Sequence, residues 1–272
     1  MIHIATVHYN STRWIDIQLR FIEKHIGTPY RTYDFLTGID PTFALRFHYA
    51  VCEPVVSHAF KLNFLADIIS RNAEPTDILM FIDGDAFPVS NIDYLINQLS
   101  HSTPLIAIQR LENGLDIQPH PSFCITTVGF WNSIKGDWNA GYTWKTPNGN
   151  ITDIGGNLLE QLQQKGIDWL PIHRTKSLGS HPLLFGVYGS CIYHHGAGFR
   201  APHTRSDLDT KPKHPLWRAI SKLIPASLPM KIRYKLHAYT RLYSATLRQN
   251  MKESQQIFEK IENAPTEIFY NE

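Results

Sequence analysis

Cysteine is scarce in this 272-residue sequence. The three cysteines, Cys52, Cys124 and Cys191, stand far apart along the chain. An odd number without paired spacing excludes a disulfide framework and the usual cysteine-based metal clusters. We therefore expect each thiol to be a small apolar filler in a protein of the reducing cytoplasm.

Long hydrophobic runs are also lacking. No apolar run approaches the roughly 18 to 20 residues that cross a bilayer, and the apolar part of "MIHIATVHYN" is too short for a signal peptide. Any membrane contact is therefore expected to be peripheral. The apolar content of 43% and the net charge of only +2 are typical of a globular protein with one large domain, or one domain and an appendage.

Charge is distributed unevenly along the chain. Residues 211–252 hold ten Lys or Arg and no Asp or Glu, whereas residues 1–210 hold 15 basic and 19 acidic side chains. We predict a domain of residues 1–205 and a basic helical C-terminal extension of residues 206–272. The extension could lie on an anionic membrane, at about 1 kcal/mol per basic residue, or pack as a solvated helix against the acidic domain. No nucleic acid is expected as a partner, because no known binding motif is present.

Strand and helix patterns alternate through the first half of the chain. The predicted strands are 2–9, 30–36, 77–82 and 104–110, and the predicted helices are 12–27, 54–72, 91–100 and 157–166. A last strand is expected within 182–200, and residues 111–150 are expected to form loops and irregular strands along a cleft. The alternation predicts an α/β fold with a mostly parallel central sheet flanked by helices.

The stretch "DILMFIDGDAFPV", residues 77–89, leads a buried strand into two carboxylates, Asp83 and Asp85. Two nearly buried carboxylates around one glycine repel each other unless a cation neutralises them. A hard divalent ion such as Mg²⁺ or Mn²⁺ prefers such oxygens and keeps positions open for phosphates. The alternative is a turn in which the aspartates bond backbone amides.

This stretch resembles the signature of the GT-A class of nucleotide-sugar glycosyltransferases, an Asp-x-Asp at the end of a buried strand. The resemblance covers roughly residues 1–203 and implies a GT-A-like (Rossmann-like) domain. It also implies that Asp85 binds the metal and that Asp83 contacts the ribose or the metal.

A second stretch, "HGAGFRAPH", resembles the pattern His-x-x-Gly-x-x-Lys-Pro-Trp, in which many members supply a distal histidine ligand. His195, Gly198 and Pro202 match it, whereas an alanine and a histidine stand in place of the Lys and the Trp. Arg200 could supply the missing cation. Because alternation along "CIYHH" places His194 and His195 on opposite faces, one of them should reach the metal, and we favour His195.

Further candidates lie at the end of the first strand and on the helix 54–72. In the class that the sequence resembles, the first strand end holds the base and ribose, and four polar side chains stand there: Thr6, His8, Tyr9 and Asn10. His58 and Lys61 share a helix face, and Lys61 could meet the diphosphate or the sugar. The alternatives are a plain strand end and a solvated lysine.

Asp153, in "TDIGGN", precedes the helix 157–166. By resemblance to the acceptor-side segment of these transferases it is a candidate base towards the acceptor hydroxyl or a contact of the donor sugar, and the alternative is a helix cap. Asp137 is a weaker rival. Three tryptophans accompany His120 in the irregular segment, and we expect at least one to line the acceptor site rather than the core: Trp131, Trp138 and Trp144.

The combined hypothesis is a metal-dependent glycosyltransferase that moves a sugar from a nucleoside diphosphate sugar to a hydroxyl of a glycan or lipid-linked acceptor, such as a cell-surface polysaccharide precursor. The metal on Asp85 and His195 would offset the charge of the leaving diphosphate, assisted by Arg200 or Lys61. One alternative is a sugar nucleotidyltransferase, although the expected Gly-rich loop is missing after the first strand. The other is a non-catalytic protein that binds a membrane or nucleic acid through the basic extension.

Overall fold

The computed structural model describes residues 1–113, 116–146, 149–181, 183–196, 219, 223–225, 227–228, 237–263 and 267–270. The chain divides into two compact units. The first unit is Met1–Lys176 with Gly186–His194, and the second is Ser177–Phe185 with His195–Glu272. The predicted boundary at residue 205 lies outside the described residues and stays a prediction.

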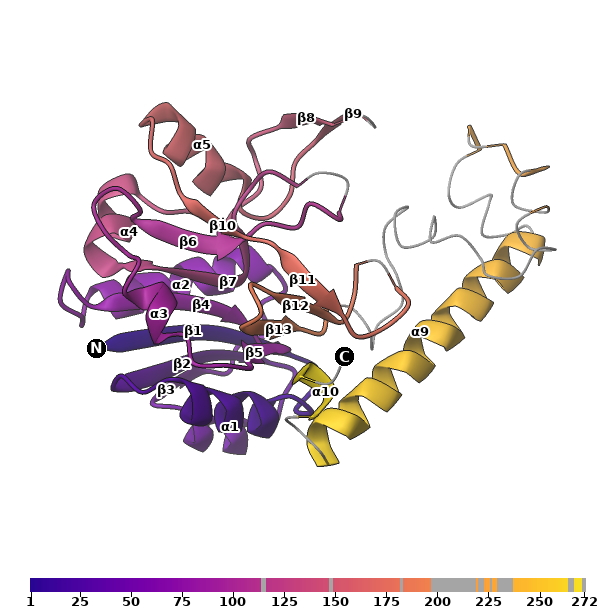
Figure 1. Cartoon of the computed structure of the whole chain (residues 1–272), viewed down its shortest axis with the longest axis horizontal. Helices are drawn as coiled ribbons and strands as arrows, with labels where there is room; N and C mark the ends of the chain where they lie inside the picture. Colours follow the sequence, from indigo (N-terminus) through magenta and orange to yellow (C-terminus); the bar gives the residue numbers. More distant parts are fainter. Residues whose placement is uncertain are drawn as a thin grey trace. The chain divides into compact units, whose positions relative to one another are not determined.

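The first unit is built on a seven-stranded sheet (Figure 1). Across the sheet, the strands are β10 (Leu170–Ile172), β6 (Leu105–Ile108), β7 (His120–Thr127), β4 (Ile78–Asp83), β1 (Ile2–Tyr9), β2 (Tyr30–Thr37) and β3 (Tyr49–Val51). Neighbouring strands are parallel, except that β7 is antiparallel to both β4 and β6. The predicted mostly parallel sheet is therefore confirmed.

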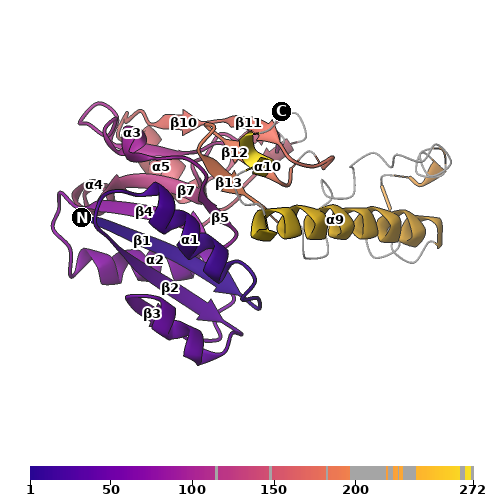
Figure 2. The same ribbon diagram turned by 60° about the horizontal axis from the view of Figure 1, so that its bottom comes forward.

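Helices cover the sheet because its strands alternate apolar side chains between two buried faces. Ala5, Val7 and Phe81 point into a cluster with α2 (His58–Ser70), α4 (Val128–Ile134) and α5 (Gly156–Gln164). Ile4 and Ile82 point into the opposite cluster, with α1 (Ile15–His25), the loop before α3 (Asp93–Ile96) and α3 itself. Figure 2 shows α1 and α2 on opposite sides of β1 and β2.

A smaller sheet lies beside this second cluster. Its order is β11 (Arg174–Ser177), β12 (Gly186–Tyr188), β13 (Ile192–His194) and β5 (Ala86–Pro88), and β13 is antiparallel to both of its neighbours. Because β5 follows β4 after a two-residue turn, the end of β4 lies next to β13. A separate hairpin joins β8 (Trp144–Thr146) to β9 (Gly149–Ile151).

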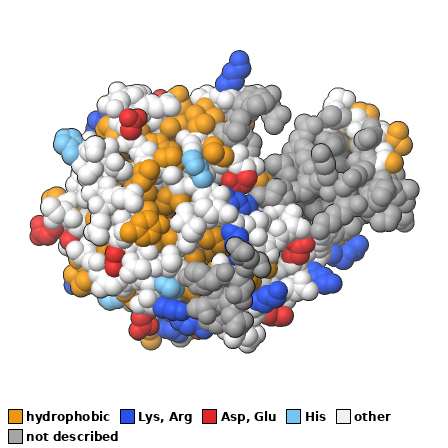
Figure 3. All heavy atoms as spheres, viewed as in Figure 1, with side chains coloured by type: hydrophobic (Ala, Val, Ile, Leu, Met, Phe, Trp, Pro, Cys, Tyr) orange, Lys and Arg blue, Asp and Glu red, His pale blue; other side chains and the backbone are white. Residues whose placement is uncertain are grey.

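The described part of the second unit contains the long helix α9 (His237–Asn263) and the short helix α10 (Glu267–Tyr270). None of the helices in the described part of the chain combines the length and the apolar character that a bilayer crossing needs. Of the basic stretch 211–252, residues 211–218, 220–222, 226 and 229–236 lie outside the described residues. On the face shown in Figure 3, hydrophobic side chains gather over the first unit and charged side chains of both signs surround them.

Several predicted elements need correction. The segment 111–150 was expected to be irregular, yet it contributes β7 to the middle of the sheet and the helix α4. Helix α2 begins at His58 rather than at residue 54, because the Ser57 hydroxyl accepts a hydrogen bond from the Phe60 N–H at 3.2 Å. The predicted helix 91–100 is reduced to the four residues of α3. Within the described part of 182–200 the structure has two short strands, β12 and β13, in place of one.

An additional short element precedes β3. The 3₁₀ helix η1 (Pro41–Arg46) begins where the Asp40 carboxylate accepts a hydrogen bond from the Thr42 N–H at 2.9 Å. Proline at its first position has a fixed φ that suits a helical turn.

Candidate functional site

The two aspartates occupy the turn between β4 and β5, at the carboxyl edge of the main sheet. Asp83 ends β4, and Asp85 directly precedes β5. Between them, Gly84 packs against β1, since a Cβ at this position would lie 2.5 Å from the Val7 carbonyl oxygen and 2.7 Å from Cδ2 of His8. Glycine is therefore required here for a close approach of the turn to the neighbouring strand.

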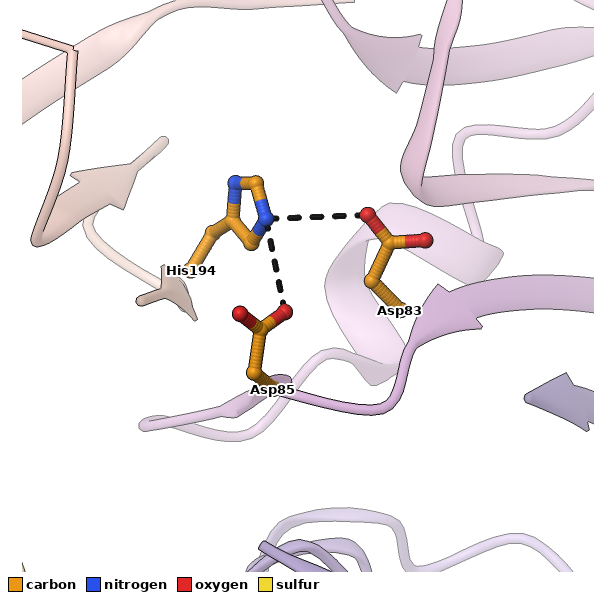
Figure 4. Close-up of side chains that lie close together, drawn as sticks. All are labelled: Asp83, Asp85 and His194. Carbon is orange, nitrogen blue, oxygen red and sulfur yellow. Dashed lines mark ion pairs between the residues drawn. The ribbon is translucent and has the colours of Figure 1, made fainter. Parts of the chain in front are cut away.

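His194 completes a triad with these carboxylates. In the ladder between β13 and β5 it pairs with Ala86, the residue after Asp85. Its Nε2 atom lies 3.5 Å from Oδ1 of Asp85 and 3.6 Å from Oδ2 of Asp83 (Figure 4). One ligand atom from each of the three residues can be chosen so that all lie within 4.8 Å of one another.

His195 does not join this triad. It is fully buried in the second unit, where Nε2 lies 2.6 Å from the Ser254 hydroxyl and the imidazole contacts the Phe185 ring at 4.8 Å between centroids. The preference for His195 is therefore corrected to His194. The alternation that separates the two rings was right, but the register of β13 against β5 decides which ring faces the aspartates.

Three imidazoles surround Asp83. Nε2 of His58 lies 2.9 Å from its Oδ1 atom, and the rings of His120 and His194 are 6.1 Å apart. His120 begins the antiparallel strand β7 and pairs with Ile108 at the carboxyl end of β6, which brings it to the same edge. Burial would raise the pKa of Asp83, but His58, His194 and His120 outweigh it and hold the pKa well below its usual range.

The donor set of this triad fits a divalent cation. Two carboxylates and one imidazole converge on a small volume, and Asp83 stays ionised. Carboxylate oxygens suit Mg²⁺ and Mn²⁺, and an imidazole nitrogen is accepted by Mn²⁺ more readily than by Mg²⁺. Three protein ligands leave coordination positions open for a substrate.

The predicted base-binding residues at the end of β1 have different surroundings. The Thr6 hydroxyl donates to Oε1 of Gln18 at 3.2 Å, and Nδ1 of His8 lies 2.6 Å from Oδ2 of Asp34. Thr6 and His8 are both buried, whereas Tyr9 is 52% exposed. Asn10 is also exposed and has a positive φ of 53°. Of these four, Tyr9 and Asn10 therefore present accessible side chains at the sheet edge.

Lys61, like Thr6 and His8, is buried. Its side chain is 1% exposed, and Nζ lies 4.7 Å from the centre of the Tyr9 ring and 5.7 Å from that of Phe35. Burial lowers the pKa of Lys61, and the nearby Asp34 carboxylate partly offsets this effect. The alternative of a solvated lysine is thus excluded. His58, three residues before Lys61 on α2, contacts Asp83.

Asp137 is the hub of a hydrogen-bond network. Oδ1 accepts hydrogen bonds from the Asn63 amide at 2.5 Å and from the Asn139 N–H at 2.9 Å, and Oδ2 accepts one from the Asn157 amide at 2.7 Å. Burial would raise its pKa, but these donors lower it. A carboxylate with its lone pairs occupied is a poor base, so the contacts favour a structural role for Asp137.

Asp153 is more accessible, with its side chain 45% exposed. Its Oδ1 atom accepts a hydrogen bond from the Ile154 N–H at 2.8 Å, and Oδ2 lies 3.4 Å from the Arg110 guanidinium. The N-cap of α5 is Gly155, which makes no side-chain cap bond, so the helix-cap alternative is not observed. Arg110 also pairs with the buried Asp116 at 3.1 Å, where burial raises the pKa of the Asp116 carboxyl.

Of the remaining predicted residues, some are buried and others lie outside the described part of the chain. All three tryptophans of 111–150 are at least 95% buried, and two of them, Trp131 and Trp138, pack in the core on the α2 side of the sheet. This contradicts the expectation that a tryptophan lines the acceptor site. Arg200, with Gly198 and Pro202, lies outside the described residues.

Sequence reasoning missed two buried polar residues: Gln18, which contacts the turn of the triad, and Asp34, which contacts His8. Gln18 stands between Ile15 and Ile22 on the buried face of α1, and Asp34 stands between Tyr33 and Phe35 in β2. For Gln18, a polar residue within an apolar helix face was the available signal, because such groups are buried only with partners.

Comparison with known proteins finds similar solved structures. No family model matches the sequence, and no curated protein matches it. PcManGT, a mannosyltransferase from Pyrobaculum calidifontis solved with GDP-Man and Mn²⁺, is 11% identical over 97% of this chain and 75% of its own, with a TM-score of 0.45. TarS 1-349 from S. aureus is 9% identical over 96% of this chain and 91% of its own, with a TM-score of 0.44.

A third similar structure is the glycosyltransferase GlyE from Streptococcus pneumoniae TIGR4. It is 10% identical over 49% of this chain, with a TM-score of 0.36, and the match spans only 35% of GlyE. The aligned part of this chain thus corresponds to about a third of the length of that protein.

Proposed function

We propose that this protein is a metal-dependent glycosyltransferase that uses a nucleoside diphosphate sugar as donor and a hydroxyl group as acceptor. The observation that carries the proposal is the triad of Asp83, Asp85 and His194 at the carboxyl edge of a mostly parallel sheet. In open sheets of this kind, ligands gather outside the carboxyl ends of the strands. The Asp-Gly-Asp signature that the sequence shares with the GT-A class occupies that place.

A divalent cation held by Asp85 and His194, with Asp83 as third ligand, would supply a Lewis acid that offsets charge on the departing diphosphate. Mn²⁺ suits the imidazole and Mg²⁺ is the alternative. His58, 2.9 Å from Asp83, keeps that carboxylate oriented and ionised before the cation arrives. Second-shell contacts of this kind typically support the affinity of a metal site.

The donor nucleotide would bind beside the metal, over the end of β1. Tyr9 offers an exposed ring for stacking on the base, and the Asn10 amide offers hydrogen bonds. Thr6, His8 and Lys61 are buried, so they would support this surface without contacting the nucleotide directly. Lys61 contacts Tyr9 through its ring, so it would orient the stacking surface and add positive charge near the diphosphate. We keep Arg200 as a candidate phosphate contact.

Asp153 is the best candidate for the base that accepts the proton of the acceptor hydroxyl. Its carboxylate is half exposed, and Arg110 restrains it from one side. The alternative role is a contact with hydroxyls of the donor sugar, in which Arg110 would also take part. We propose that the acceptor is a glycan or a lipid-linked glycan in the cytoplasm. Residues 211–252 would contact the membrane peripherally.

A panel of UDP-, GDP-, CDP- and dTDP-linked sugars tests this function. With Mn²⁺ or Mg²⁺ present, at least one donor should raise the melting temperature. At a donor concentration 100 times its Kd, binding adds about 2.7 kcal/mol to the free energy of unfolding. The same donor should be slowly hydrolysed, and Asp85→Ala should abolish both effects. Asp153→Asn should retain donor binding and lose transfer. If no donor binds in the presence of either metal, the proposal is wrong.

A further inference from the structure

The turn that carries the two aspartates of the triad is held by two hydrogen bonds from one side chain, Gln18. We call this pair of hydrogen bonds the clamp. Gln18, on α1, is fully buried at the inner side of this turn. Its amide nitrogen donates one hydrogen bond to the Asp83 carbonyl at 2.7 Å and a second to the Ala86 carbonyl at 2.8 Å. One side chain thus ties together the first and last residues of the segment that carries both carboxylates.

The orientation of the Gln18 amide is fixed by its partners. Both protons of the NH₂ group are used by backbone carbonyls, and Oε1 accepts the Thr6 hydroxyl at 3.2 Å. If the oxygen and nitrogen exchanged places, the amide oxygen would face two carbonyl oxygens without a proton between them. Every polar atom of the side chain is therefore satisfied, as burial requires.

We propose that Gln18 is a positioning residue of the metal site, which rests on the function proposed above. Without a cation, the carboxylates of Asp83 and Asp85 repel each other and favour a wider turn. Because the two carbonyls share one nitrogen as donor, the turn cannot open without breaking a buried hydrogen bond. Gln18 thus keeps both carboxylates at ligand distance, and metal binding does not have to order the turn.

The position of the clamp in the fold supports this role over plain packing. Gln18 is a polar residue on the buried face of α1, between Ile15 and Ile22. An apolar side chain would suffice to pack the helix against the sheet, but it could not donate a hydrogen bond to either turn carbonyl. A buried amide, that of Gln18, therefore stands at the turn that must keep one shape to hold both carboxylates.

Manganese binding to the whole protein, followed by electron paramagnetic resonance without nucleotide, tests this inference. Gln18→Met keeps the volume and removes the amide. It should weaken Mn²⁺ binding by about 10- to 100-fold, the range of outer-shell changes at metal sites. Thr6→Val removes only the hydrogen bond that steadies Oε1 and should weaken binding by roughly two- to tenfold. All titrations are run well below the melting temperature of each variant.

Thr126→Val is the matched control. Thr126 is fully buried and donates to the Pro104 carbonyl at 2.7 Å, and its strand neighbour Leu79 lies near the start of β4, away from Asp83. This variant should lose stability but bind Mn²⁺ like the unmodified protein.

The outcomes separate the clamp from the site itself. If Mn²⁺ binds and Gln18→Met binds it equally well, the clamp is wrong and the metal site stands. Should Gln18→Met fail to fold, unchanged Mn²⁺ binding by Thr6→Val overturns the clamp. If the unmodified protein binds no Mn²⁺, with or without donor nucleotide, both proposals fail. Equal weakening by Thr126→Val would reduce the effect to general destabilisation and also overturn the clamp.

Discussion

His194 and Asp85 lie next to each other at the end of the ladder between the short antiparallel strands β13 and β5. Nε2 of His194 lies 3.5 Å from Oδ1 of Asp85, and His194 pairs with Ala86 in the register between β13 and β5. A shift of this register by one residue would place the other face of β13 towards the turn. The small sheet therefore selects the histidine that can join the aspartates.

The first prediction concerns the two adjacent histidines. His194→Ala removes a ligand atom and should weaken Mn²⁺ binding at least tenfold, whereas His195→Ala should leave Mn²⁺ affinity unchanged. His195→Ala should instead lower the unfolding free energy, because Ser254 loses its buried partner at 2.6 Å. Isothermal titration with Mn²⁺ and urea unfolding of both variants measure the two effects. The reverse assignment of effects would contradict the site described here.

The second prediction concerns Gly84. A methyl group there would meet the Val7 carbonyl at 2.5 Å, so Gly84→Ala must push the turn away from β1. We expect a loss of about 1 to 3 kcal/mol in unfolding free energy, together with weaker Mn²⁺ binding. Gly27→Ala is the control, since its methyl group would meet only the Asp93 carboxylate, at 3.2 Å. Wild-type stability and metal affinity in Gly84→Ala would show that the close approach is not needed.

The sequence was informative where local pattern and burial agree. Alternating strands and helices predicted the order of β1, α1, β2, α2 and β4, because each has a periodicity that its own residues determine. The aspartates at the end of β4 were placed at the correct edge for the same reason. The carboxyl end of a parallel strand is known as soon as its direction is known.

The contacts that depend on pairing between distant segments were not predictable from local pattern. Strand β7 enters the middle of the sheet antiparallel to both neighbours, and its sequence "HPSFCITT" follows a stretch rich in turn-forming residues. This pairing places His120 at the carboxyl edge of the main sheet, near the triad. The choice between His194 and His195 likewise depends on cross-strand register, which no periodicity within "CIYHH" fixes.

The third prediction concerns the edge of the sheet away from the triad. Oδ2 of Asp77 lies 3.1 Å from Nε2 of His3, and Oδ1 lies 2.8 Å from the amino group of Met1. Burial would raise the pKa of Asp77, but these partners lower it from 3.8 to about 2. A carboxyl group with a depressed folded-state pKa stabilises the protein above its unfolded pKa, and this stability is lost as pH falls towards 2.

Asp77→Asn should therefore cost about 1 to 2 kcal/mol of unfolding free energy at pH 7, allowing for partial solvent screening. The difference from the unmodified protein should shrink progressively between pH 5 and pH 2. Urea unfolding at pH 7, 4 and 2.5 measures it. Asp67→Asn, in an exposed pair with Arg71, should change stability by less than about 0.5 kcal/mol. A pH-independent difference for Asp77→Asn would contradict the ionic explanation.

The fourth prediction compares two buried glutamines. Gln18 is 0% exposed with every amide atom bonded, whereas Gln118 is 1% exposed and, among the described residues, neither its Nε2 nor its Oε1 atom has a hydrogen-bond partner. A buried amide without partners costs about 1 to 3 kcal/mol relative to an apolar group of the same shape. Gln118→Met should therefore raise the unfolding free energy, and Gln18→Met should lower it, although both replace a buried amide by the same thioether.

Urea midpoints at constant m-value measure the two changes, and their opposite signs are the test. Each variant is the control for the other, because side-chain volume and the introduced residue are the same. If Gln118→Met also destabilised the protein, the amide would have a partner in solution, for which a buried water is the simplest candidate. Stabilisation by Gln118→Met with unchanged Mn²⁺ binding would mark Gln118 as a group whose removal leaves the metal site intact.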